Sequence, residues 1–160
     1  MSLNIIKKDL IKAFKENEIN VIIQQCNVFC TQGSGLAKNI RQEYPEVYNV
    51  DAATIKGDRS KLGTFTHAVI NRENISPVGY IINLYGQYAY GKGLQTDYDA
   101  QRKGFKNIVE FLNNCGSVDT IKIGLPLIGC GLAGGDWNVV QQIIKEELVD
   151  KGFNVSVYTL

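Results

Sequence analysis

The 160-residue sequence contains little of what metal sites, membrane spans and disulfide frameworks require. It has one histidine, His67, and four cysteines, and no second pair is spaced to complete a zinc site with Cys26 and Cys30. No run approaches the roughly 20 apolar residues of a membrane-spanning helix, and no signal-peptide pattern opens the sequence. We therefore expect free thiols, no metal, no other cofactor, no membrane partner and a cytoplasmic location.

The sequence also lacks an excess of charge of either sign. Seventeen Lys and Arg stand against 16 Asp and Glu, which gives a net charge of +1. Because this balance creates no broad basic field, we expect no direct binding to nucleic acid. An anionic ligand would have to be held by local backbone groups and helix dipoles. The length suits one domain, residues 1–160, and no repeat or linker divides it.

Short apolar runs alternate with apolar residues at helical spacing, and these two patterns predict strands and helices respectively. Pro45 ends the second helix, residues 46–63 are polar and predicted to be irregular, and Ser76-Pro77 predicts a turn between two strands. The alternation predicts a layered α/β fold whose sheet is mixed, with the buried strands at its centre. Strands are expected at 3–6, 20–24, 64–70, 79–83, 121–125 and 153–158, and helices at 9–15, 36–44, 98–112 and 137–148.

Two glycine-rich loops each connect a buried strand to a helix. The first, residues 26–37, contains Gly33-Ser34-Gly35, and the second, residues 127–137, contains four glycines between 129 and 135. Glycine lets the backbone approach a ligand closely, and a helix N-terminus offers unpaired N–H groups and the positive end of its dipole. Each loop can therefore hold a phosphate, and the two together suit a diphosphate beyond the carboxyl ends of the strands.

A glycine-rich loop of this kind can also be no more than a tight turn. The first loop has no third glycine where the dinucleotide-binding motif needs one, and neither loop ends in the Gly-Lys-Ser/Thr of a P-loop. The spacing of the glycines alone therefore indicates an anion-binding α/β protein and nothing narrower.

At these loops the sequence resembles the macrodomain (Appr-1″-p processing) family, and the resemblance covers nearly the whole chain. The matching motifs are Asn27 with Gly33-Ser34-Gly35-Leu36-Ala37, then Pro126-Leu127-Ile128-Gly129-Cys130-Gly131, and the strand Ile82-Asn83-Leu84-Tyr85-Gly86-Gln87. The resemblance implies a three-layer α/β/α fold around a mixed, mostly parallel central sheet, and a small-molecule ligand, ADP-ribose or ADP-ribose 1″-phosphate.

Residues 128–132 and 157–160 are most similar to two groups within that family. One group is the ADP-ribose 1″-phosphate phosphatases of the yeast type, and the other removes terminal ADP-ribose from glutamate side chains. The second group has an Asp directly after Gly-Cys-Gly-Leu and a Lys after the central strand, where this sequence has Ala133 and Leu84-Tyr85-Gly86. Three functions remain open: the phosphatase, a hydrolase acting on ADP-ribosylated protein, and a non-catalytic ADP-ribose-binding module.

The candidates for catalysis are Asp136, the carboxylate of the second loop, with Asn27 and His67. Asp136 could act as a general base or a nucleophile, although an Asp before Trp137 is well placed to cap a helix, and one residue could do both. His67 titrates in a useful range but lies in a strand-like stretch, which favours a structural role. Asn27 would bond the distal ribose.

The resemblance also assigns the substrate-binding residues. Asp9 would contact the adenine amino group, although Lys8 replaces the glycine that usually precedes it. Tyr158 and Leu160 would line the adenine pocket unless they belong only to an edge strand. Tyr85, Tyr88 and Tyr90 could cover the ligand or only pack within their loop. The full predicted set is Asp9, Leu10, Asn27, Gly33, Ser34, Gly35, Leu36, Gly129, Cys130, Gly131, Leu132, Ala133, Tyr158 and Leu160.

Overall fold

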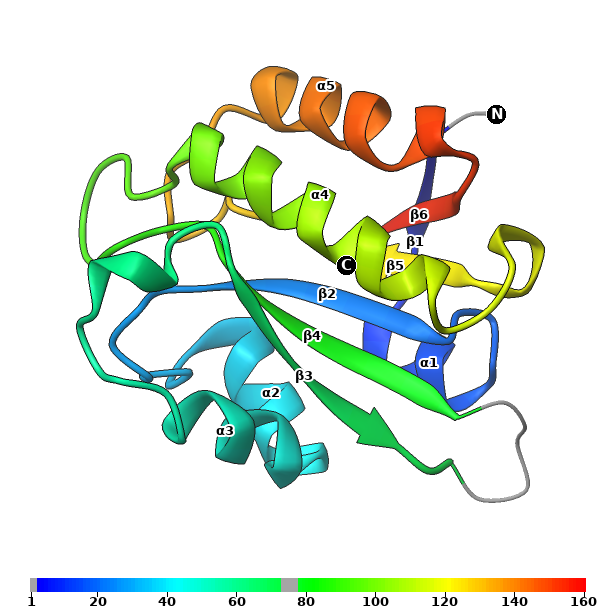
Figure 1. Ribbon diagram of the computed structural model, residues 1–160, viewed down its shortest axis with the longest axis horizontal. Helices are drawn as coiled ribbons and strands as arrows, with labels where there is room; N and C mark the ends of the chain where they lie inside the picture. Colours follow the sequence, from blue (N-terminus) through cyan, green and yellow to red (C-terminus); the bar gives the residue numbers. More distant parts are fainter. Residues whose placement is uncertain (1–2, 73–77) are drawn as a thin grey trace.

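A computed structural model of the protein describes residues 3–72 and 78–160, which form one six-stranded sheet with helices on both faces (Figure 1). The strands are β1 (Asn4–Lys7), β2 (Val21–Cys26), β3 (Phe65–Ile70), β4 (Gly79–Tyr85), β5 (Lys122–Leu125) and β6 (Asn154–Thr159). The helices are α1 (Leu10–Lys15), α2 (Gly35–Glu43), α3 (Pro45–Ala52), α4 (Tyr98–Asn113) and α5 (Trp137–Glu147). Short 3-10 segments occur at η1 (Arg59–Lys61), η2 (Val118–Thr120) and η3 (Val149–Lys151).

The sheet is mixed and mostly parallel, as predicted. Its strand order is β1-β6-β5-β2-β4-β3, and only β3 runs antiparallel to its neighbour, β4. The continuous apolar run of β2 places that strand between β5 and β4, where both faces are covered. The last strand, β6, is not an edge strand, because it pairs with β1 on one side and β5 on the other. The predicted turn at Ser76-Pro77 lies outside the described residues.

Alternate side chains of the central strands point to opposite faces of the sheet and pack into two hydrophobic cores, one on each face. Ile23 of β2 and Ile82 of β4 pack with α4 and α5, which lie together on one face (Figure 1). Ile22 and Ile81 pack with α1, α2 and α3 on the opposite face. The protein therefore has the three-layer α/β/α arrangement. Within the described ranges, no helix has the length and apolar character needed to cross a membrane.

Helix α3 corrects the prediction that residues 46–63 are irregular. Pro45 occupies the first turn of α3 immediately after α2 has ended at Glu43. Proline is favoured at the first helical position because the missing N–H has no partner there in any case. The same residue therefore ends one helix and begins the next. The new helix buries Val47 and Asp51 completely.

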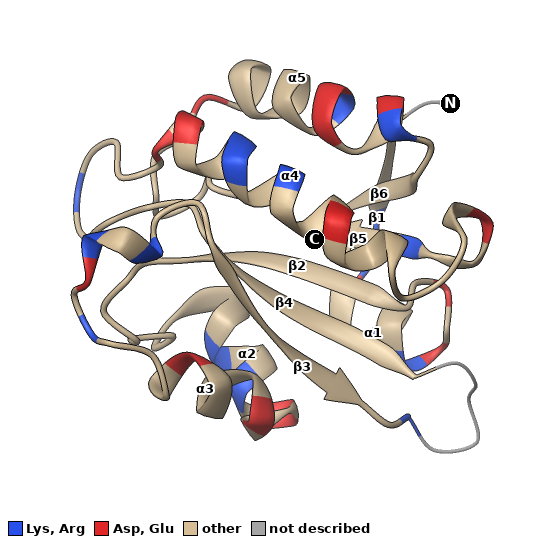
Figure 2. Cartoon of the chain, viewed as in Figure 1, with Lys and Arg blue, Asp and Glu red and all other residues tan. Residues whose placement is uncertain are grey.

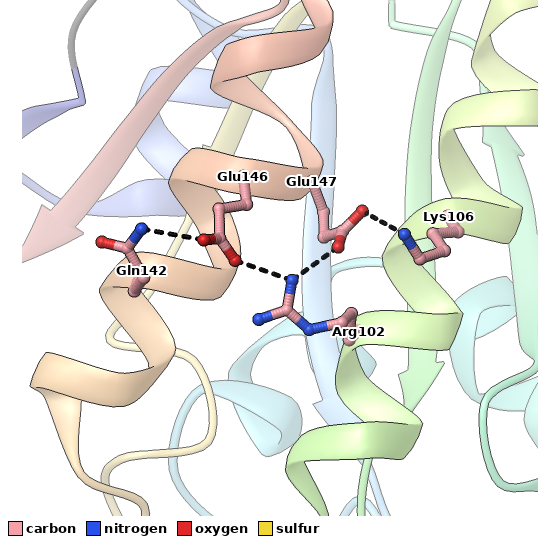
Figure 3. Close-up of polar contacts among 5 residues, drawn as sticks. All are labelled: Arg102, Lys106, Gln142, Glu146 and Glu147. Carbon is pink, nitrogen blue, oxygen red and sulfur yellow. Dashed lines mark hydrogen bonds and ion pairs between the residues drawn. The ribbon is translucent and has the colours of Figure 1, made fainter.

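Helices α4 and α5 are joined by a network of charged side chains (Figure 3). Arg102 of α4 donates to Glu146 at 2.8 Å and to Glu147 at 2.7 Å, and Lys106 donates to Glu147 at 2.8 Å. Most charged residues lie on helices and loops, and β2, β3 and β4 carry no Lys, Arg, Asp or Glu (Figure 2). The network therefore holds the C-terminal end of α5 against α4.

Candidate functional site

A cavity of about 1110 Å³ lies at the carboxyl ends of β2 and β5. Both glycine-rich loops line it, as the sequence predicts for a fold of this type. A third wall comes from the loop between β4 and α4, residues 86–97, which we call the central loop. The lining residues are Gln24, Gln25, Cys26, Asn27, Thr31, Gln32, Gly33, Ser34, Gly35, Leu36, Ala37, Asp51, Gln87, Tyr90, Gly91, Lys92, Gly93, Leu94, Pro126, Leu127, Ile128, Gly129, Gly131, Leu132, Ala133 and Gly134.

The first loop presents the N-terminus of α2 to the cavity. Helix α2 begins at Gly35, whose φ of 58° is a left-handed conformation suited to glycine. Ser34 makes no side-chain capping hydrogen bond to the helix, so its hydroxyl does not compete for the first-turn N–H groups. Asn27 shapes the loop itself: its Oδ1 accepts from the Phe29 N–H at 2.8 Å and its Nδ2 donates to Thr31 at 2.7 Å. The loop is therefore shaped to receive an anion at the helix end.

Asp51, near the C-terminal end of α3, holds the first loop through a hydrogen bond to Gln32. Its buried carboxylate accepts from the Tyr85 hydroxyl at 2.6 Å and from Gln32 Nε2 at 3.0 Å. Gln32 has a φ of 37°, a conformation that non-glycine residues rarely adopt, so an outside contact is needed to hold it. Lys61 adds a second anchor, because its Nζ donates to the Val28 carbonyl at 2.8 Å. Burial and the neighbouring Asp51 raise the pKa of Tyr85, which keeps the hydroxyl protonated as a donor.

The second loop turns sharply on its glycines. Gly129 and Gly134 have φ values of 73° and 72°, and the Gly135 N–H donates to the Gly129 carbonyl at 2.8 Å. Gly131 has no positive φ, and a Cβ built on it would meet nothing within 4 Å. Its backbone therefore faces open space where a ligand can approach. Burial, aided by the charge of Asp136, raises the pKa of the Cys130 thiol to about 11.

Gln25, at the end of β2, connects the second loop to the rest of the site. Its Nε2 donates to Gln87 at 3.0 Å and to Thr96 at 2.9 Å, and its Oε1 accepts from Gln101 at 2.9 Å. The Thr96 hydroxyl in turn donates to the Gly129 carbonyl at 2.7 Å. One polar network therefore joins the end of β2 to the central loop, α4 and the second loop. It holds these walls of the cavity in place without a ligand.

The central loop packs against the second loop. The N–H groups of Gln95 and Thr96 both donate to the Ala133 carbonyl, at 2.7 and 3.2 Å. Tyr90 and Leu94 line the mouth of the cavity and are exposed. Of the three tyrosines expected to cover the ligand, Tyr90 alone lines the cavity, while Tyr88 packs against Phe29 with ring centroids 5.1 Å apart.

The Macro domain family matches residues 23–144, which is most of the chain and includes both glycine-rich loops. The chain belongs to the Macro domain family. Its sequence is 31% identical over 147 residues to an uncharacterized 17.5 kDa protein of Enterobacteria phage T4, an alignment that covers 90% of this chain and 88% of the phage protein.

Solved structures similar to this macrodomain agree with the fold. A protein of unknown function from Bacteroides thetaiotaomicron is 30% identical with a TM-score of 0.78, over 100% of this chain and 99% of that one. DarTG of Thermosipho africanus, solved in complex with ADP-ribose, is 19% identical with a TM-score of 0.71. That similarity covers 99% of this chain but only 41% of the DarTG chain, and at this identity it shows the fold alone.

The substrate-binding residues predicted for this macrodomain fall into two sets. Those that line the cavity are Asn27, Gly33, Ser34, Gly35, Leu36, Gly129, Gly131, Leu132 and Ala133. Asp9, Leu10, Cys130, Tyr158 and Leu160 lie outside the lining. Asp9 caps α1 by accepting from the Ile11 N–H at 3.0 Å, and the Tyr158 hydroxyl donates to Glu18 at 2.5 Å. Their role at an adenine ring stays a prediction.

Asp136 and His67, two of the catalytic candidates, also lie outside the cavity lining. Asp136 caps α5, since its Oδ1 accepts from the Asn138 N–H at 2.9 Å. It lies near the end of the second loop, and its own N–H donates to the Tyr98 hydroxyl at 3.0 Å. His67 of β3 packs against Phe111 with ring centroids 4.5 Å apart, and burial lowers its pKa. Across residues 3–72 and 78–160, no three His, Cys, Asp or Glu side chains gather as a metal site would require.

Proposed function

We propose that this macrodomain binds ADP-ribose or a close derivative in the cavity between its two glycine-rich loops. One observation carries the proposal: a cavity of about 1110 Å³ is lined by both strand-to-helix loops at once. A diphosphate offers two anionic groups to two sets of backbone N–H donors. Asn27 lines the same wall; its Nδ2 uses one N–H on Thr31, which leaves the second N–H for the distal ribose. The ADP-ribose complex of the similar DarTG structure supports this choice of ligand.

We further propose that the activity is hydrolysis of ADP-ribose 1″-phosphate to ADP-ribose and phosphate. Asp136 would take a proton from a water molecule as its oxygen attacks phosphorus. The bond from phosphorus to the 1″-oxygen then breaks, and that oxygen takes the proton from Asp136 to leave as the hydroxyl of ADP-ribose, while the former water oxygen stays on the released phosphate. The cap on α5 uses only Oδ1 of Asp136, and no hydrogen bond within the described residues uses Oδ2. The second candidate function is ligand binding without catalysis. The observation that supports it is that Asp136 does not line the cavity.

The test is release of free phosphate from ADP-ribose 1″-phosphate by the parent and by Asp136→Asn. Asn caps a helix as well as Asp, so the melting temperature should stay unchanged. Loss of the base should lower the rate by roughly 10²-fold or more. Asp97→Asn is the matched control, since Asp97 caps α4 in the same way and lies outside the cavity lining.

Three results are distinguishable in this experiment. A rate loss in Asp136→Asn but not in Asp97→Asn supports the general base. Parent-like turnover by Asp136→Asn removes Asp136 from the chemistry. A parent protein that binds ADP-ribose but releases no phosphate is not this phosphatase, which leaves a binding module or a hydrolase of ADP-ribosylated protein.

A further inference from the structure

Lys92 is a cation placed at the cavity that the assignments above leave without a role. Among the lining residues only Lys92 and Asp51 have charged side chains, and the Asp51 carboxylate is buried and hydrogen-bonded to Tyr85 and Gln32. Lys92 is exposed, and within residues 3–72 and 78–160 no carboxylate pairs with its ammonium group. The ammonium group is therefore available to a ligand.

The backbone around Lys92 is a shaped turn. Gly91 and Gly93 flank it with φ values of 121° and 86°, a range that side-chain-bearing residues rarely adopt. The Lys92 carbonyl accepts from Gln95 Nε2 at 3.0 Å, which closes the turn. Two glycines and a side-chain bond thus define where Lys92 projects from the central loop.

This turn lies directly against the second loop. The Gln95 N–H donates to the Ala133 carbonyl at 2.7 Å, and a Cβ built on Gly134 would lie 2.6 Å from the Gly93 carbonyl oxygen. Lys92 therefore lines the cavity from the side of the second loop. Gly131, the glycine of that loop with the most open surroundings, lines the same cavity.

We propose that Lys92 recognises a terminal phosphomonoester on the ligand, so that the site prefers ADP-ribose 1″-phosphate to ADP-ribose. This inference rests on the proposed ligand. Each phosphate of the diphosphate carries one charge and can be met by backbone N–H groups of the two loops. A terminal phosphomonoester carries a charge of about −1.5 to −2 and three strong acceptor oxygens, so it gains most from a nearby cation. Lys92 is the cation that lines this cavity.

The test is isothermal titration with both ligands of the parent sequence, Lys92→Met and Lys92→Arg, each carrying Asp136→Asn so that ADP-ribose 1″-phosphate is not hydrolysed during the measurement. Lys92→Met should weaken binding of ADP-ribose 1″-phosphate about tenfold, because a charge-assisted hydrogen bond is lost. Its affinity for ADP-ribose should stay within about twofold of the parent, since the diphosphate contacts do not involve Lys92. Lys92→Arg should keep the preference. Lys145→Met is the matched control, because it removes the same charge from an exposed lysine of α5 outside the cavity lining.

Each other outcome has a definite meaning. Equal loss for both ligands would place Lys92 on the diphosphate and overturn the inference. Unchanged affinities in Lys92→Met, or the same loss in Lys145→Met, would also overturn it. If the parent binds neither ligand, the proposed function fails first, and that result is separate from any behaviour of the variants.

Discussion

Gly131 and Gly134 belong to the same loop, yet a side chain would act differently at each. A Cβ on Gly131 meets nothing within 4 Å, and its φ is not positive. Gly134 has a φ of 72°, and its Cβ would lie 2.6 Å from the Gly93 carbonyl oxygen. Gly134 is therefore required by the fold, whereas Gly131 is free of that requirement and lines the cavity.

We therefore predict that Gly131→Val blocks ligand binding and spares the fold. The new side chain would occupy space that the ligand needs, and affinity for ADP-ribose should fall at least roughly tenfold. Stability should change by no more than about 0.5 kcal/mol, as for a surface substitution without strain. Titration calorimetry and thermal unfolding measure the two effects. In contrast, Gly134→Val should lower the melting temperature, since a left-handed backbone costs a non-glycine residue about 1–2 kcal/mol. Normal binding by a folded Gly131→Val protein would remove this loop from the site.

At the same scale, the sequence predicted the glycines of the site together with Asn27 and Ser34, but not Asp51 or Gln25. Gly35, Gly129 and Gly134 carry a local conformational signal, because positive φ favours glycine wherever it occurs. Asp51 and Gln25 carry no such signal. Their contacts join positions far apart in the chain, such as Gln25 with Thr96 and Gln101. Only the folded arrangement brings those partners together.

At the scale of elements, α3 shows that a segment without an evident pattern can matter to the site. Its apolar positions are few, so periodicity gave no helix, although proline at the first turn was an available signal. The helix places Asp51 under the first loop, where it holds Gln32 in a strained conformation. The helices and strands with regular apolar spacing were predicted to within a few residues.

The ion pairs between α4 and α5 should make the free energy of unfolding depend on pH in the acid range (Figure 3). Burial by itself raises the pKa of Glu147, but the hydrogen bonds from Lys106 and Arg102 outweigh it and hold the pKa below its ordinary value of 4.5. The charged form is therefore favoured by folding, and its contribution is present above pH 4.5 and is lost as pH falls through the lowered pKa. Glu147→Gln should cost about 1–2 kcal/mol of unfolding free energy at pH 7, as expected for lost bonds to charged groups. Urea unfolding at a series of pH values measures the difference from the parent, which should shrink below pH 4.5.

Glu146→Gln is the control for that measurement. Glu146 bonds the same Arg102 but its side chain is 42% exposed, against 4% for Glu147. Solvent screens an exposed pair, so this variant should unfold almost as the parent does. A Glu147→Gln protein with the same stability gap at pH 3 and pH 7 would show that the Glu147 charge does not link α4 to α5.

At the scale of the whole molecule, the order of strands decides where the ligand can lie. The strands β2 and β5 are parallel neighbours, so the loops that follow them emerge at the same edge of the sheet. The sequence supported this expectation through two buried strands, each followed by glycines. The tyrosines of the central loop indicated that it could cover the ligand, but nothing in residues 86–97 indicated that it packs against the second loop. In the structure that loop bonds to the second loop through Ala133 and closes one side of the cavity.

The measurement that tests the account most directly is calorimetric titration of the unmodified protein with ADP-ribose and with AMP. AMP carries the adenosine half of ADP-ribose but lacks the second phosphate and the distal ribose, so it can engage only one of the two loops. We predict that ADP-ribose binds at least roughly tenfold more tightly than AMP, since a second anion contact and further hydrogen bonds are lost with AMP. Equal affinity for the two ligands would contradict a site built from both glycine-rich loops.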